Sequence, residues 1–311
     1  MKPKYLDIPM RVESVQFIIV GTTDILNNKE RNTIESFRIL KQTGNTISVV
    51  FTNNETIADF CKERGVLVRP IQSRNIYGLP VLRDIFLAVQ KEFPHRHLVY
   101  LNLDILINPS LLLTASYLIS QRKDNKFLFV SRVMNSNVTE SLTMQSLYSY
   151  ERFINDHANG KLRLYVAMDI FIFPCTYHFQ DVDPVVVGRW FVDTALMKDA
   201  QRKKYYIYDM TGLISLHQGF DTSKKIFKGV QEDFEYNKML LQKRNDAGIV
   251  YLTANYWGCH WSVCFKCYSV DGVKERGMEL EWIECLAMFR DSNHLHRSMR
   301  VDGCCSVFGG K

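Results

Sequence analysis

The chain lacks several sequence features, and each absence argues against one class of protein. No segment approaches the roughly 18 consecutive apolar residues of a membrane-spanning helix. The first residues lack the apolar core of a signal peptide, which predicts a cytoplasmic protein, with a piece of a secretory-pathway protein as the alternative. No extended basic patch is interleaved with aromatic residues, so nucleic acid is not an expected partner. Internal repeats and low-complexity tracts are also missing.

The charge balance is mildly basic, with 39 Lys and Arg residues against 33 Asp and Glu residues in a chain of 311. This excess is compatible with an anionic small ligand. The length allows one large domain, or a main domain with an appendage. Six of the eight cysteines follow residue 258, which marks the C-terminal part as different in composition. The spacing of Cys259, Cys264 and Cys267 leaves open a zinc site or simple reduced thiols.

Apolar runs alternate with amphipathic segments along the first half of the chain, which predicts an α/β fold. We expect strands at residues 14–21, 46–51, 66–68, 97–101 and 126–130, and helices at residues 28–43, 55–64, 80–93 and 109–121. This order predicts a Rossmann-like, mostly parallel central sheet flanked by helices. The alternation fades after Gly219. We therefore expect a main domain at residues 1–225 and a smaller Cys- and Trp-rich C-terminal extension at residues 226–311.

Asn102 and Asp104 interrupt the apolar run at residues 98–107. A carboxylate in such a run is costly to bury unless it is paired or binds a cation. On a strand, residues two apart face the same side, so both side chains are expected to point into a cleft while Leu103 points into the core. Oxygen ligands suit Mn²⁺ or Mg²⁺, which often share them with a diphosphate. The alternative is that Asp104 caps the helix predicted to begin at Pro109.

Two more polar residues belong to later apolar runs. Asp169 interrupts residues 165–173, and His217 ends the strand predicted at residues 213–218. In an open α/β sheet the ligand lies beyond the carboxyl ends of the strands, so these residues could converge with Asp104. We expect His217 to be a further metal ligand.

Asp193 opens a predicted helix and is expected to be the general base that takes a proton from an acceptor hydroxyl, with Asp169 as the second candidate. The alternative for Asp193 is an acid favoured at a helix N-terminus by the helix dipole. Arg189 could bind a phosphate of the ligand, or it could form a structural ion pair with Asp193.

Thr22, Thr23 and Asp24 follow the first predicted strand, where nucleotide-binding α/β sheets place their first ligand contacts. We expect these residues to contact a nucleotide. The segment is not a Gly-rich phosphate-binding loop, so the expectation rests on position alone.

Five short motifs occur in a fixed order: Gly78-Leu79-Pro80, Tyr100-Leu101-Asn102-Leu103-Asp104-Ile105, Asp169-Ile170-Phe171-Ile172-Phe173, Gly188-Arg189-Trp190-Phe191-Val192-Asp193 and His217-Gln218. Together they resemble those of nucleotide-diphospho-sugar glycosyltransferases of the GT-A type, and more narrowly a group of uncharacterised GT-A-like proteins. The resemblance covers residues 14–222. It implies a GT-A-like fold, a nucleotide-sugar donor held by the first strands and a metal at Asp104. Two departures, Gly219-Phe220 after the His-Gln pair and Thr194-Ala195 after Asp193, concern the acceptor side.

The main hypothesis from the sequence is therefore a metal-dependent glycosyltransferase. It would move a sugar from a nucleoside-diphosphate sugar to a hydroxyl of a glycan, protein or lipid acceptor, with residues 1–225 as the catalytic domain. A nucleotidyltransferase is a second possibility, although it would normally show a Gly-rich basic loop after the first strand. A non-catalytic binding or scaffold protein is the third, because Asp104 is a single carboxylate where many of these enzymes have two.

Overall fold

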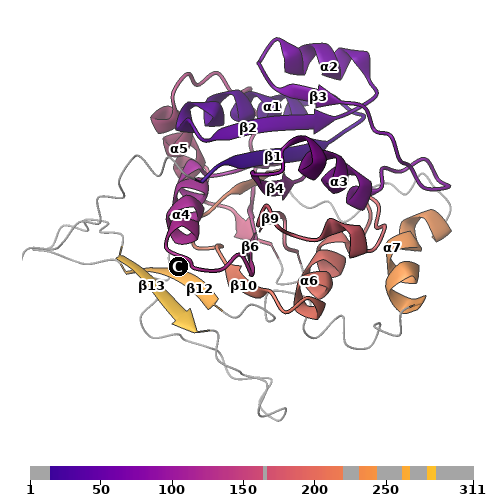
Figure 1. The fold of residues 1–311 in the computed structure, drawn as a ribbon. Helices are drawn as coiled ribbons and strands as arrows, with labels where there is room; N and C mark the ends of the chain where they lie inside the picture. The colour runs from indigo at the N-terminus through magenta and orange to yellow at the C-terminus, as the bar shows by residue number, and fades with distance from the viewer. Residues whose placement is uncertain (1–14, 164–166, 220–230, 244–260, 267–278, 285–311) are drawn as a thin grey trace, which may run out of the picture.

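The computed structural model describes residues 15–163, 167–219, 231–243, 261–266 and 279–284 (Figure 1). A nine-stranded sheet forms its centre. From one edge to the other its strands are β3 (Leu67–Arg69), β2 (Thr46–Phe51), β1 (Phe17–Thr22), β4 (His97–Leu101), β9 (Ile170–Phe173), β6 (Phe127–Ser131), β10 (Tyr206–Asp209), β12 (Trp261–Lys266) and β13 (Glu279–Glu284). The predicted class, a mixed α/β protein with a Rossmann-like central sheet, is confirmed.

Most strands of this sheet are parallel, but β9 runs against both of its neighbours and the edge strand β13 runs against β12. Ile170, the first residue of β9, pairs with Leu101 at the end of β4 and with Ser131 at the end of β6. The start of β9 therefore lies at the edge where the parallel strands end. As a result Asp169, directly before β9, belongs to the same edge as the residues that follow β4.

Helices cover both faces of the sheet. One hydrophobic core contains side chains of α1 (Asn28–Leu40), α2 (Glu55–Lys62), α4 (Pro109–Ser120) and α5 (Leu147–Asp156). The other contains side chains of α3 (Leu82–Glu92), α6 (Val192–Arg202) and α7 (Gln231–Lys243). Strand β1 contributes Phe17 and Ile19 to the first core and Ile18 and Val20 to the second. This alternation is what a strand buried on both faces requires.

A second, four-stranded sheet has the order β5 (Ile105–Leu106), β11 (Leu216–Gln218), β7 (Met134–Ser136) and β8 (Lys161–Leu162). In its antiparallel pairing of β5 with β11, His217 lies opposite Ile105. The chain therefore brings His217 beside Asp104, 113 residues earlier in the sequence.

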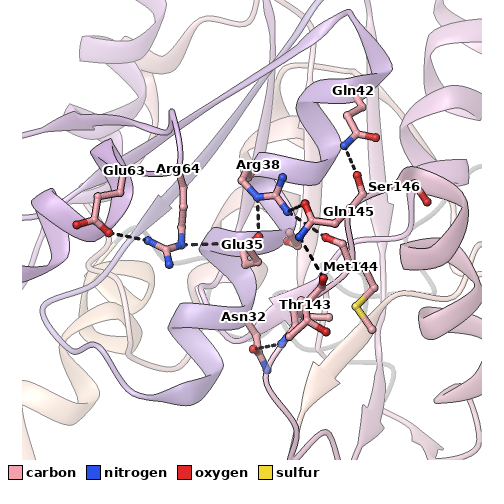
Figure 2. Close-up of polar contacts among 12 residues, drawn as sticks. Asn32, Glu35, Arg38, Gln42, Glu63, Arg64, Thr143, Met144, Gln145 and Ser146 are labelled. Carbon is pink, nitrogen blue, oxygen red and sulfur yellow. Dashed lines mark hydrogen bonds and ion pairs between the residues drawn. The ribbon is translucent and has the colours of Figure 1, made fainter.

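Side chains of α1 contact residues 139–145, a segment without regular secondary structure, part of which Figure 2 shows. The amide oxygen of Asn32 accepts a hydrogen bond from the backbone N–H of Leu142 at 2.9 Å. The guanidinium of Arg38 donates to the carbonyl of Met144 at 3.0 Å. Asn32 also donates to the buried amide oxygen of Gln218 at 3.0 Å, so this segment, α1 and β11 are held together.

The region after residue 225 contributes to this architecture. Helix α7 packs on α6, and β12 pairs with β10 while β13 pairs with β12 at the lower left of Figure 1. The domain boundary at residue 225 stays a prediction. Cys264 lies on β12, whose side chains are not described. The other C-terminal cysteines lie outside the described residues: Cys259, Cys267, Cys285, Cys304 and Cys305. Among the described helices, none is long and apolar enough to cross a membrane.

Candidate functional site

The site begins where β4 ends. Residues 102–104 leave the strand in a tight turn, in which the carbonyl of Asn102 accepts a hydrogen bond from the N–H of Ile105 at 3.1 Å. The expectation that Asn102 and Asp104 share a strand face is therefore wrong, because strand alternation stops at Leu101. Leu103 does point into the core: a Cβ on Gly21 would lie 2.6 Å from its Cδ2.

Asp104 and His217 are in direct contact. The Oδ2 atom of Asp104 lies 3.1 Å from Nε2 of His217, and Nδ1 of the same ring lies 3.1 Å from the carbonyl oxygen of Gly219. Both ring nitrogens thus face oxygen acceptors, whereas a neutral imidazole has a single N–H to donate. A ring that donates from Nδ1 to the Gly219 carbonyl would turn its Nε2 lone pair toward Asp104, where a cation or a proton could lie between the two side chains.

Asp169 is the most buried carboxylate of the site, with 6% of its surface exposed. Arg163 donates to its Oδ1 atom at 2.5 Å, while Oδ2 is buried without a hydrogen-bond partner in the described part of the chain. Burial raises the pKa of Asp169 to about 7, against the opposing effect of the Arg163 charge. Asp193 and Asp104 raise this pKa further, and His217 lowers it.

Asp193 lies in the first turn of α6, as predicted, and its carboxylate accepts hydrogen bonds from two backbone N–H groups. Its Oδ1 accepts from the N–H of Thr194 at 3.0 Å and its Oδ2 from the N–H of Met168 at 3.2 Å. Burial raises the pKa of Asp193 to about 6, although these backbone hydrogen bonds and the charge of Arg163 lower it. The carboxylate thus links the start of α6 to the segment that carries Asp169.

The structure brings Asp104, Asp169, Asp193 and His217 into one electrostatic cluster. Besides their effects on Asp169, the three carboxylates each raise the pKa of Tyr100, which burial raises most. The Tyr100 hydroxyl donates to the amide oxygen of Asn102 at 3.4 Å. Such mutual effects between buried carboxylates are typical of functional sites, although structural ion pairs also produce them.

Two residues that contact or sense this cluster, Arg163 and Tyr100, carry no signal of a role in the sequence. Arg163 lies in the segment between β8 and β9, where no pattern singled it out. Tyr100 belongs to the motif at residues 100–105, but in the sequence it is indistinguishable from the other apolar residues of a buried strand.

The loop after β1 lies at the same edge of the sheet. The Thr22 hydroxyl donates to the carbonyl of Phe51 at 3.0 Å, and the Thr23 N–H donates to the same carbonyl at 3.3 Å. Asp24 is exposed and forms an ion pair with Arg74, with an oxygen–nitrogen distance of 3.1 Å. The nucleotide contact expected of these residues stays a prediction.

Arg189 does not pair with Asp193. Its guanidinium forms a two-pronged ion pair with Asp233 on α7, at 3.1 and 2.6 Å. This pair joins the loop before α6 to α7. The carboxylate takes two of the guanidinium donors, which leaves little to support Arg189 as a phosphate ligand.

A hollow of about 360 Å³ lies between β2, β3 and α3. This volume falls in the range of roughly 300–1,000 Å³ that is usual for small-molecule sites. Its walls include Phe51 and Ser73, which adjoin the β1 loop and Arg74, and none of the clustered carboxylates lines it. The hollow and the cluster are thus two separate features, and Phe51 connects the hollow to the β1 loop.

Asp104 and His217 fit a metal ion in part. Two neighbouring ligands of an octahedral cation, each at about 2.1 Å, lie about 3 Å apart, close to the observed 3.1 Å. The contact between Nδ1 and a backbone carbonyl is the usual support for a metal-binding histidine. Among the described residues, however, no group of three or more His, Cys, Asp or Glu side chains could hold a metal. Any cation here would take most of its ligands from water or substrate.

Comparison with known proteins adds little to this geometry. No protein-family model and no curated protein matches the chain. One similar solved structure is a cytidylyltransferase from Leptospira borgpetersenii serovar Hardjo-bovis (strain JB197), 16% identical, with a TM-score of 0.40 over 76% of this chain and 96% of that chain. Another is a mycobacterial protein, 10% identical, with a TM-score of 0.43 over 91% of this chain and 89% of that chain. At these low values neither structure carries an argument about binding or activity.

Proposed function

We propose that this chain is a metal-dependent glycosyltransferase that moves a sugar from a nucleoside-diphosphate sugar to a hydroxyl acceptor. The observation that carries the proposal is the contact of Asp104 with His217 at the carboxyl edge of the sheet, next to Asp169 and Asp193. A metal-binding pair beside a carboxylate with a raised pKa supplies the two functions that such a transfer needs.

Asp104 and His217 would hold Mn²⁺ or Mg²⁺. A cation bound there would neutralise the negative charge that develops on the departing diphosphate. With its proton on Nδ1, donated to the Gly219 carbonyl, His217 would direct the Nε2 lone pair toward Asp104. Diphosphate oxygens and water would complete the coordination. Asn102, expected as a further ligand, is exposed, and its amide oxygen accepts from Tyr100.

Asp169 is the better candidate for the base, which reverses the order expected from the sequence. Both oxygens of Asp193 already accept backbone hydrogen bonds, whereas Oδ2 of Asp169 has no hydrogen-bond partner among the described residues. A pKa of about 7 suits a group that must take a proton near neutral pH. Oδ2 would take the acceptor proton as the new glycosidic bond forms and the bond to the diphosphate breaks. This role applies to inversion, because retention requires no such base.

The nucleoside part of the donor would lie over the β1 loop, with Thr22, Thr23 and Asp24 as contacts. The neighbouring hollow shares Phe51 with this loop and has room for a nucleobase. Arg189 is better explained as the structural partner of Asp233.

A thermal-shift titration tests the proposal. UDP-, GDP- and dTDP-sugars are added with and without Mn²⁺ to the wild-type protein, to Asp104→Ala, and to Asp59→Ala as an exposed control. A ligand at 100 times its Kd stabilises the folded state by about 2.7 kcal/mol, which raises the melting temperature by several degrees. We expect a Mn²⁺-dependent shift in the wild type and in Asp59→Ala, and none in Asp104→Ala.

The other candidate functions give different results in this experiment. No shift with any nucleotide sugar would contradict the glycosyltransferase and favour a scaffold. Release of pyrophosphate from a nucleoside triphosphate and a sugar phosphate would instead identify a nucleotidyltransferase.

A further inference from the structure

Lys29, in the first turn of α1, places its side-chain tip beside the Asp104–His217 pair. Its ammonium nitrogen lies 2.7 Å from the position that a Cβ atom on Gly219 would occupy, and its Cε lies 3.2 Å from the same point. Gly219 is also the residue whose carbonyl contacts His217. The lysine tip therefore lies against the same residue that contacts the imidazole.

The backbone around Lys29 is fixed. Its N–H donates to the Asn27 side chain at 2.9 Å, and its carbonyl accepts from the buried Gln218 side chain at 3.0 Å. The Asn27 side chain thus already accepts hydrogen bonds from N–H groups of the first helical turn. The distinctive feature is therefore the Lys29 side chain and not the helix end.

The ammonium of Lys29 forms no hydrogen bond or ion pair with any described residue, although acidic groups are near. It lowers the pKa of Glu30, which burial and Asp104 raise. A surface lysine can normally rotate to pair with a nearby carboxylate such as Glu30. The tip of Lys29 lies against Gly219 instead. The space exists because residue 219 has no side chain, and its φ of +100° favours glycine as well.

We propose that the Lys29 ammonium binds a phosphate oxygen of the nucleoside diphosphate, an inference that rests on the function proposed above. A cation at Asp104 and the charge of Lys29 would repel each other unless an anion lay between them. A diphosphate has oxygens enough to bind both. Lys29 would then offset negative charge on the departing diphosphate that the metal leaves unneutralised.

Titration calorimetry with UDP, GDP, dTDP and inorganic pyrophosphate, each with Mn²⁺, tests this role. We expect Lys29→Met to weaken binding of the diphosphates by about tenfold and Lys29→Arg to stay within about threefold of the wild type. Mn²⁺ alone should bind equally to all three proteins. Lys41→Met is the matched control, because it removes the same charge at the other end of α1, where Lys41 is exposed.

Gly219→Ala provides a second variant that keeps the lysine. Its Cβ would displace the Lys29 tip, so diphosphate affinity should fall. Alanine is strained at a φ of +100° and the Gly219 carbonyl contacts His217, so Mn²⁺ affinity is measured beside it. A loss of diphosphate affinity larger than the loss of Mn²⁺ affinity supports the inference, and equal losses contradict it. Circular dichroism spectra confirm that each variant is folded.

Two results would overturn the inference, and they differ in what they leave standing. If the wild type binds a diphosphate with Mn²⁺ and Lys29→Met binds it equally well, the inference is wrong and the proposed function survives. If the wild type binds none of the four probes with Mn²⁺, the proposed function fails and the role of Lys29 fails with it.

Discussion

Replacing Asp169 by asparagine should remove much of the pH dependence of stability near neutrality. Burial raises the pKa of Asp169 from 3.8 to about 7. Between these values the folded state holds a proton that the unfolded state has lost, so the free energy of unfolding falls as the pH rises. Between about pH 5 and about pH 8, this single group should lower the free energy of unfolding of the wild type by about 2 to 3 kcal/mol. The Asp169→Asn variant has no titrating proton at this position. Over the same pH range its free energy of unfolding should therefore fall by about 2 to 3 kcal/mol less than that of the wild type.

Urea unfolding of the wild type and of Asp169→Asn at pH 5 and at pH 8 measures this difference in the free energy of unfolding. Asp59→Asn, on the exposed side of α2, is the control and should follow the wild type within about 0.5 kcal/mol. If Asp169→Asn loses as much stability as the wild type over this range, Asp169 is ionised throughout. The argument that its carboxylate is poised to take a proton near pH 7 would then fail.

Further predictions concern the residues around the site. Gln218→Leu should destabilise the fold by about 3 kcal/mol in urea unfolding, since the buried amide donates to Lys29 and Thr33 and accepts from Asn32; a loss below about 1 kcal/mol would refute this. Gly21→Ala should cost about 1 to 3 kcal/mol through its clash with Leu103, and adding Leu103→Ala should change stability by less than the sum of the two single changes. Simple additivity would contradict the clash. Arg189→Met should lower the melting temperature yet leave donor affinity within about twofold, because its partner is Asp233; a larger loss of affinity would restore its predicted role at a phosphate.

The fold was largely predictable because the periodicity of apolar residues indicates where the strands and helices lie. Buried strands alternating with amphipathic helices predict a mostly parallel sheet, and the central sheet of the structure is mostly parallel. The reversed direction of β9 was not predictable, since an apolar run such as Ile170–Phe173 looks the same in either direction. That reversal is nevertheless what brings Asp169 to the edge where the parallel strands end.

The sequence predicted which polar residues lie at the ends of strands, but not which of them contact each other. Position at the end of a strand pointed to Asp104 and His217, but their contact depends on the pairing of β5 with β11, strands of two and three residues. Elements this short leave no periodic signal. The pairing of Asn102 with Asp104 failed for a related reason, because a turn replaces the strand at residue 102. Lys29 was missed because a charged residue at a helix start usually faces solvent.

We propose that Asp104 and His217 hold a metal that activates a nucleotide-sugar donor. The most direct measurement is the release of nucleoside diphosphate from UDP-, GDP- and dTDP-sugars with Mn²⁺, comparing the wild type with Asp104→Asn. Our account predicts release from at least one donor by the wild type, loss of that release on chelation, and a fall of at least about a hundredfold in Asp104→Asn. Equal release by the two proteins, or release that persists after chelation, would contradict it.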